Sequence, residues 1–213
     1  MLNRLPANER RPQLVESALD VAERGGIGAV TIRAVADNAG VSLGVVHYCF
    51  ENKEALITAM GEYLILQLSS LWREAFSVAH NSSLRGLSGL RQLLYLGLDR
   101  MWPTVDAAPD RQLLAYEITA YALRYRAAGP TLAGGIANEQ YRIRDVEAMA
   151  FLEECAERTG TVWIEPVSAI VRLSLAILDG LVLRWLVDRD SDAIVVELDE
   201  LARIIAAKAV ERA

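Results

Sequence analysis

The sequence is poor in the residues that build disulfide-held or metal-held folds and enzyme sites. Its 213 residues include two cysteines, Cys49 and Cys155, and two histidines, His47 and His80. Two cysteines are too few for a disulfide framework or a four-cysteine zinc site. The histidines fall in no HExxH or Ser-His-Asp arrangement, and the chain has no P-loop and no GxGxxG motif. We therefore predict no catalytic residues, no metal and no cofactor.

The chain also lacks an excess of positive charge. It has 22 Lys and Arg against 28 Asp and Glu, a net charge of −6, which by itself argues against a nucleic-acid partner. The charge is uneven, however, because residues 1–55 hold six basic and seven acidic side chains. Attraction to DNA depends on the local surface, so this nearly neutral N-terminal segment is compatible with DNA binding.

Long uncharged apolar runs are missing as well. The most apolar stretch, residues 167–187, contains Arg172, Asp179 and Arg184. Each charge near the centre of a bilayer costs about 3 kcal/mol. The first twelve residues are polar and show no signal-peptide pattern. We expect a cytoplasmic protein with no membrane partner.

What is present is helical periodicity. Apolar residues recur at spacings of three and four through most of the chain, whereas the alternation typical of strands is hard to find. Gly25 and Gly26 predict the end of the first helix. Short punctuated helices fill residues 1–55 and long apolar helices fill residues 56–213. The sequence thus predicts an all-α fold with two domains at these bounds.

Two long helices are expected near the C-terminus, at residues 138–158 and 166–189. The second is apolar nearly all round, so one face can serve its own core and the other a partner subunit. A central helix of a monomer would have the same composition. A last helix is expected from about residue 195 to 210. We predict a homodimer held by helices 138–158 and 166–189.

Residues 31–50, TIRAVADNAGVSLGVVHYCF, have the spacing of a helix-turn-helix. Two short helices that cross steeply need a small residue where they nearly touch, here Ala36. Gly40 follows four residues later, where a left-handed turn favours glycine, and Val46 can fill the interface. The residues placed to cap the two helices are Thr31 and Ser42. On these residues alone, an ordinary corner between two helices remains an alternative.

The flanking residues extend the pattern. The run from Leu14 to Met60 resembles the DNA-binding domain of the TetR family of one-component transcriptional regulators. The resemblance implies an N-terminal three-helix helix-turn-helix DNA-binding domain and a C-terminal helical ligand-binding and dimerisation domain. The segments that carry it are Gly-Gly-Ile-Gly-Ala-Val at 25–30, Thr31-Ile32, Ala34-Val35-Ala36, Gly40-Val41-Ser42, Gly44, His47-Tyr48-Cys49-Phe50 and Asn52-Lys53-Glu54-Ala55-Leu56.

The second helix of this motif is expected to lie in the major groove, with its first residues nearest the base edges. Leu43, where family members often carry lysine, and Val45 can contact a thymine methyl group. Arg10 and Arg11 can track the DNA backbone, although solvated surface is an equal alternative. The predicted DNA-binding residues are Thr31, Arg33, Ser42, Leu43, Gly44, Val45, His47, Tyr48, Lys53, Arg10 and Arg11.

The resemblance also implies a pocket for a small-molecule effector, enclosed by the middle helices. Aromatic residues at helical spacing more often belong to a core than to a ligand site, and acidic residues there are more often solvated or in salt bridges. The candidate pocket residues are Met60, Tyr63, Trp72, Tyr95, Asp99, Trp102, Tyr116, Glu117 and Tyr121.

Together these observations predict a ligand-responsive transcriptional repressor. It would bind a palindromic operator in double-stranded DNA as a homodimer and be released by an unknown small-molecule effector. The alternative is a helical ligand-binding or adaptor protein whose helix-turn-helix no longer binds DNA, which the acidic balance and Leu43 favour. Selection of a palindrome from random DNA separates the two.

Overall fold

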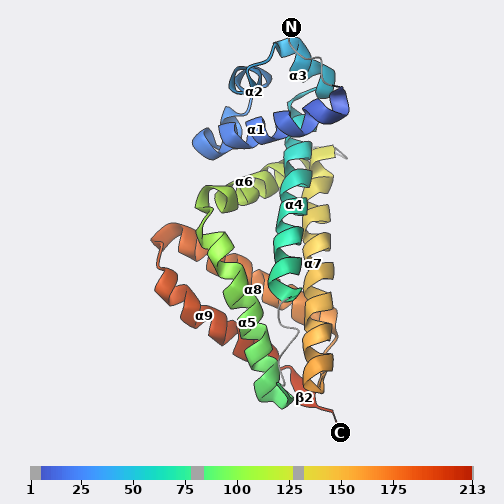
Figure 1. Ribbon diagram of the computed structural model, residues 1–213, viewed down its shortest axis with the longest axis vertical. Coiled ribbons are helices and arrows are strands. Elements are labelled where there is room, and N and C mark those ends of the chain that lie inside the picture. The colour runs from blue at the N-terminus through green and yellow to red at the C-terminus, as the bar shows by residue number, and fades with distance from the viewer. Residues whose placement is uncertain (1–5, 78–83, 127–131, 213) are drawn as a thin grey trace. The chain divides into compact units, whose positions relative to one another are not determined.

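The computed structural model describes residues 6–77, 84–126 and 132–212, and they are helical almost throughout, which confirms the all-α prediction. Two short strands accompany the helices (Figure 1). The elements are α1 (Ala7–Ala29), α2 (Ile32–Ala39), α3 (Leu43–Cys49), α4 (Lys53–Ser77), α5 (Gly86–Asp106), α6 (Pro109–Arg126), α7 (Leu132–Thr159), β1 (Thr161–Trp163), α8 (Val167–Asp188), α9 (Ser191–Ala206) and β2 (Ala209–Glu211).

The chain forms two compact units. Unit 1 comprises Met1–Gln67 and Asp110–Tyr141, and unit 2 comprises Leu68–Pro109 and Arg142–Ala213. Each unit is built from two separate stretches of sequence, so the long helices α4 and α7 contribute to both. The predicted DNA-binding segment, residues 1–55, forms the N-terminal part of unit 1.

In unit 1, α1, α2 and α3 bury a small apolar core. Leu14, Ala18, Val35, Val46 and Phe50 are each at most 1% exposed. The periodic apolar face of α1 lies against α2 and α3 (Figure 1), because burying that face stabilises short helices that would be marginal alone.

The first helix breaks where the glycine pair predicts, but it does not end there. Gly26 has φ 74° and ψ 171°, and one more helical turn, Ile27–Ala29, follows it. The predicted end of this helix is therefore corrected to a kink.

Helix α7 begins six residues before the predicted start at 138, at Leu132. The additional turn is stabilised by packing within unit 1. Ile136 lies so close to Gly61 of α4 that a β-carbon on Gly61 would approach it to 2.6 Å. Ile136 and Ala137 are 4% and 6% exposed. Their burial offsets the cost of about 1 kcal/mol for each glycine in the first turn.

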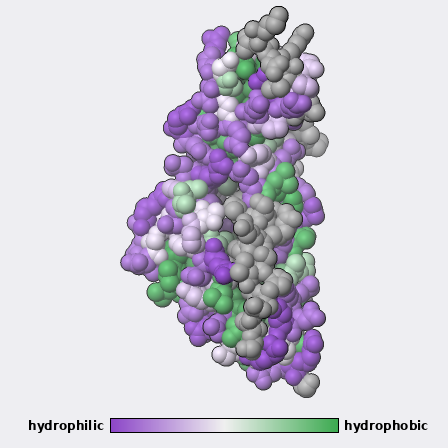
Figure 2. Space-filling view, viewed as in Figure 1, coloured by the Kyte–Doolittle hydropathy of each residue, from purple (hydrophilic) through white to green (hydrophobic). Residues whose placement is uncertain are grey.

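In unit 2, α5 and α9 lie side by side and α8 packs against α9 (Figure 1). Trp102 and Trp185 meet edge to face, with ring centroids 5.1 Å apart. Val195 and Val196 of α9 are exposed, and hydrophobic residues interrupt the hydrophilic surface of this unit in the space-filling view (Figure 2).

The two strands were not predicted, and they shorten the expected last helix, which ends at Ala206. They pair antiparallel, with Val162 opposite Val210. Gly160, at φ 70°, ends α7 and turns the chain into β1, since glycine adopts this left-handed conformation without strain. The pairing joins residues far apart in sequence, which local patterns do not reveal.

Candidate nucleic-acid interface

The turn between α2 and α3 holds the two helices in a helix-turn-helix arrangement. Thr31 accepts a hydrogen bond from the Ala34 N–H at 3.0 Å and so caps α2. Gly40 has φ 65° and ends that helix. Ala36 and Val46 are 1% and 0% exposed, as the spacing predicts. Packing at these points fixes the direction of α3 relative to α2.

One face of α3 is left open to solvent by this packing. Tyr48 is 76% exposed and Leu43 is 40% exposed, Ser42, Gly44 and His47 are also exposed, and Val45 is half-buried. Ser42 stands before the first turn, but its side chain forms no capping hydrogen bond, so that part of the prediction is wrong. The structure brings the six predicted residues 42–45, 47 and 48 onto one short element.

Arg11, a predicted DNA contact, binds within the domain. Its guanidinium donates to the carbonyl oxygen of Cys49 at 3.0 Å and lies 4.5 Å from the centre of the Phe50 ring. It therefore fastens α1 to the end of α3. Burial raises the pKa of the Cys49 thiol, and the positive charges of Arg11 and Arg10 oppose this shift.

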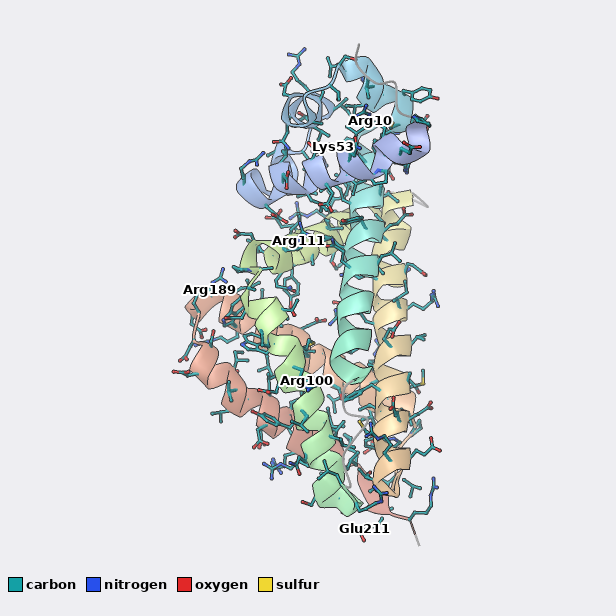
Figure 3. The ribbon with its side chains drawn as sticks, viewed as in Figure 1. Arg10, Lys53, Arg100, Arg111, Arg189 and Glu211 are labelled. Atoms are coloured by element: carbon teal, nitrogen blue, oxygen red, sulfur yellow. The ribbon has the colours of Figure 1, made fainter. Side chains whose placement is uncertain are left out.

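The other predicted basic contacts differ in their surroundings. Lys53 points its ammonium at the carbonyl oxygens of Ile27 and Gly28, at 3.4 and 3.5 Å (Figure 3). Arg10 donates to Gln13 at 2.9 Å. Arg33, on the first turn of α2, is exposed. Lys53 thus joins the end of α1 to the start of α4, while Arg33 is open to a phosphate.

Helix α6 is tied to α1 inside unit 1. The carboxylate of Glu117 accepts the Ile27 N–H at 2.6 Å, directly after the kink at Gly26. Arg111 donates to Glu23 at 2.7 Å and is half-buried in that ion pair (Figure 3). Glu117, a candidate effector residue, therefore has a structural partner in the kinked helix.

The candidate effector residues fall in both units. In unit 1, Met60 is fully buried, Tyr63 donates to Glu16, and Tyr116 and Tyr121 are half-buried. In unit 2, the Tyr95 hydroxyl donates to Asp99 at 3.3 Å, and burial together with that carboxylate raises the pKa of Tyr95. Trp102 is 6% exposed, and its indole N–H has no hydrogen-bond partner among the residues that the structure describes. The side chain of Trp72 lies outside the described residues.

Unit 2 contains an apolar cavity of about 40 Å³ between α5, α7, α8 and α9. Its only polar side chain, Ser174, donates its hydroxyl to the Ile170 carbonyl at 2.7 Å. None of the candidate effector residues whose side chains the structure describes lines it, and the helical periodicity of apolar residues was the sequence signal for those that do. The lining residues are Leu94, Leu98, Ala148, Phe151, Leu152, Val171, Ser174, Leu175, Leu178, Leu201 and Ile205.

Within the described parts of the chain, no three His, Cys, Asp or Glu side chains come close enough to hold a metal ion. The helices in those parts include none with the length and hydropathy needed to cross a membrane.

Comparison with known sequences identifies similar regulators. Residues 14–60 match the family described as bacterial regulatory proteins, tetR family. The nicotine-responsive transcriptional repressor HdnoR of Paenarthrobacter nicotinovorans is 26% identical over 187 residues, which cover 87% of this chain and 88% of that protein. The transcriptional regulator BetI of Pseudomonas aeruginosa PAO1 is 33% identical over 76 residues, 36% of this chain and 39% of that protein.

Solved structures share the fold. A transcriptional regulator from Rhodococcus sp. Rha1 superposes with a TM-score of 0.70 at 20% identity, covering 93% of this chain and 97% of that one. The regulator FadR from Bacillus subtilis, in complex with stearoyl-CoA, superposes with a TM-score of 0.69 at 14% identity and covers 92% of this chain and 98% of that one.

Proposed function

We propose that the chain is a ligand-responsive transcriptional repressor of the TetR family, whose model matches residues 14–60. It binds a palindromic operator as a homodimer, and a small-molecule effector releases it. The observation that carries the proposal is the open face of α3, which α2 and a left-handed Gly40 hold in the geometry of a recognition helix. Residues 1–55 bind DNA in this proposal, and residues 56–213 bind the effector and the partner subunit.

A stripe of small and apolar residues on α8 supports the dimer. Its members are exposed and follow one another at spacings of four and three, so they share one face of the helix. Leu173, Leu183 and Val187 are 43%, 50% and 77% exposed, and an exposed apolar face of this kind marks an interaction site. The α8 stripe consists of Ala169, Leu173, Ala176, Gly180, Leu183 and Val187.

Two copies with α8 at a two-fold axis present two α3 helices to one DNA duplex. Half-sites read in this way lie about 34 Å, one helical turn, apart. The DNA-binding segment, residues 1–55, is nearly neutral. Specificity therefore depends on the spacing of the two α3 helices and on individual side-chain contacts more than on general attraction to positive charge. Helix 138–158 supplies the second pair of the predicted interface.

The apolar cavity in unit 2 is the proposed core of the effector site. Its volume of about 40 Å³ is far below the roughly 300–1,000 Å³ of a typical ligand pocket. An effector must therefore displace leucine and phenylalanine side chains to enter. Such a repacking distinguishes two states of unit 2, and an effector that favours one state changes affinity for DNA by a coupling of about 1–3 kcal/mol.

Selection from random DNA with the full chain tests the proposal. We expect a palindromic sequence, and light scattering should give a molar mass twice the 23.4 kDa of the chain. Leu183→Glu, on the α8 stripe, should yield a monomer that binds the palindrome weakly. Leu123→Glu is the matched control, since Leu123 is 48% exposed on α6. Recovery of no sequence from the selection would favour the adaptor alternative.

A further inference from the structure

The recognition helix carries none of the charged or amide side chains that typically read base edges through hydrogen bonds. In the major groove, Arg and Lys read guanine, Asn and Gln read adenine, and Asp and Glu read cytosine. Helix α3 has the sequence LGVVHYC, which contains none of these six residue types. The one hydrogen-bonding heterocycle, His47, lies in the last turn of α3, away from the N-terminal residues that approach the base edges.

The amide side chains next to α3 are engaged within the domain. Asn38 donates its amide to the hydroxyl and the carbonyl oxygen of Ser17, at 2.8 and 3.2 Å, and accepts from Arg24 at 2.6 Å. The Asn52 carbonyl oxygen caps α4 by accepting the Ala55 N–H at 2.9 Å. Reading adenine with either amide would break these hydrogen bonds.

The cations near α3 are engaged in the same way. Arg24 donates to the Asn38 amide, Arg11 to the last carbonyl of α3, and Lys53 to two carbonyls at the end of α1. Arg33 is exposed, but it lies on α2, the helix that crosses the DNA backbone in this arrangement. Its expected partner is a phosphate.

Apolar surface is what remains at the start of α3. Leu43 is its first residue and is 40% exposed, although leucine usually packs inward. Val45 is half-buried beside it, and Gly44 between them has no side chain to keep a base away. Ser42 can hydrogen-bond to any base and so discriminates little. The chemical group in the major groove that matches such a surface is the C5-methyl group of thymine.

We propose that this protein reads its operator chiefly through thymine methyl groups, with Leu43 as the residue that determines specificity. The inference rests on the proposed function and adds to it the kind of half-site that α3 recognises. Thymines stand in each half-site where the first turn of α3 enters the groove. Burial of one methyl group contributes about a fourfold gain in affinity, so one thymine in each half-site gives about fifteenfold.

Replacing thymine by uracil tests this directly, because uracil keeps every hydrogen bond and loses only the methyl group. The duplex selected from random DNA is resynthesised with deoxyuridine at the half-site thymines. A control duplex carries the same number of deoxyuridines outside the protected base pairs. Fluorescence anisotropy with the full chain should show about fourfold weaker binding per half-site methyl removed, and unchanged binding to the control duplex.

The variant Leu43→Ala, measured with the thymine and uracil duplexes, tests the role of Leu43. Its preference for the thymine duplex over the uracil duplex should be smaller than that of the wild type, because Val45 and the alanine methyl group keep part of the apolar contact. Leu113→Ala, at a residue 47% exposed on α6, should keep the wild-type discrimination. Equal wild-type affinity for both duplexes, or a guanine in the selected site whose recognition Arg33→Ala abolishes, would overturn the inference while DNA binding stands. Failure to select any sequence would overturn the proposed function itself.

Discussion

The glycine at the kink of α1 gives a quantitative test of how unit 1 is held together. Gly26 has φ 74° and ψ 171°, a conformation that is close to exclusive to glycine. A β-carbon there would lie 3.3 Å from both carboxylate oxygens of Glu117. One of those oxygens accepts the Ile27 N–H at 2.6 Å. Gly26→Ala therefore strains the backbone and crowds a hydrogen bond between α6 and α1.

The two effects can be given magnitudes. Backbone strain of this kind costs about 1–3 kcal/mol. The carboxylate must also retreat by a few tenths of an ångström, which weakens a charge-assisted hydrogen bond worth about 1.5–3 kcal/mol. Backbone strain together with partial loss of this hydrogen bond should lower the free energy of unfolding by about 3 kcal/mol. For a chain of this length that corresponds to a decrease in Tm of about 6–12 °C.

Urea unfolding followed by far-UV circular dichroism measures the change, with Gly28→Ala as the control. A β-carbon on Gly28 meets nothing within 4 Å, and alanine favours a helix over glycine by about 1 kcal/mol, so this variant should be at least as stable as the wild type. In a Glu117→Ala background, Gly26→Ala should cost only the backbone strain. A Gly26→Ala protein with wild-type stability would refute the reasoning.

Three further predictions concern other parts of the chain. Leu94→Ala, at a residue 1% exposed that lines the cavity of unit 2, should lower the free energy of unfolding by about 2–5 kcal/mol; a loss below about 1 kcal/mol in urea unfolding would mean that the cavity collapses instead. Arg33→Ala should reduce the slope of log K against log salt concentration by about 1.8 in anisotropy titrations, about 0.9 for each subunit of the dimer, and an unchanged slope would contradict the phosphate contact. Burial raises the pKa of the Cys155 thiol from 9.0 to about 12, so the reactive thiolate forms only as the pH rises toward that value. Native protein at pH 8 should therefore leave Cys155 unlabelled by a disulfide reagent, labelling should speed up above pH 9, and rapid labelling at pH 8 would contradict the burial.

The hydrogen-bond partners of the predicted basic DNA contacts could not be deduced from the sequence. Arg11 was predicted to contact DNA from its place in the N-terminal arm, and Lys53 to contact a phosphate from its place at the start of a helix. The structure pairs Arg11 with a carbonyl 38 residues away and Lys53 with carbonyls 25 and 26 residues away. Partners at such separations depend on how the helices pack, and a single sequence carries no direct record of that.

The cavity and the strand pair also depend on packing between segments that are far apart in sequence. The lining of the cavity comes from α5, α7, α8 and α9, and each leucine in it is indistinguishable from an ordinary core residue when one helix is viewed alone. The β1–β2 pair joins Thr161–Trp163 to Ala209–Glu211, two short runs with too few residues for an alternating pattern.

By itself, the sequence determined the features that depend on neighbours within about ten residues. The helix-turn-helix is the main example, because the small Ala36, the left-handed Gly40 and the inward Val46 act across a single turn. Helix periodicity and the break at the glycine pair are local in the same sense. The tertiary structure decided which charges stay open and which close the fold. A hydrogen bond such as that of Glu117 to Ile27, 90 residues apart, exists only after the helices have buried their apolar faces, since burial is what brings such distant groups within reach of each other.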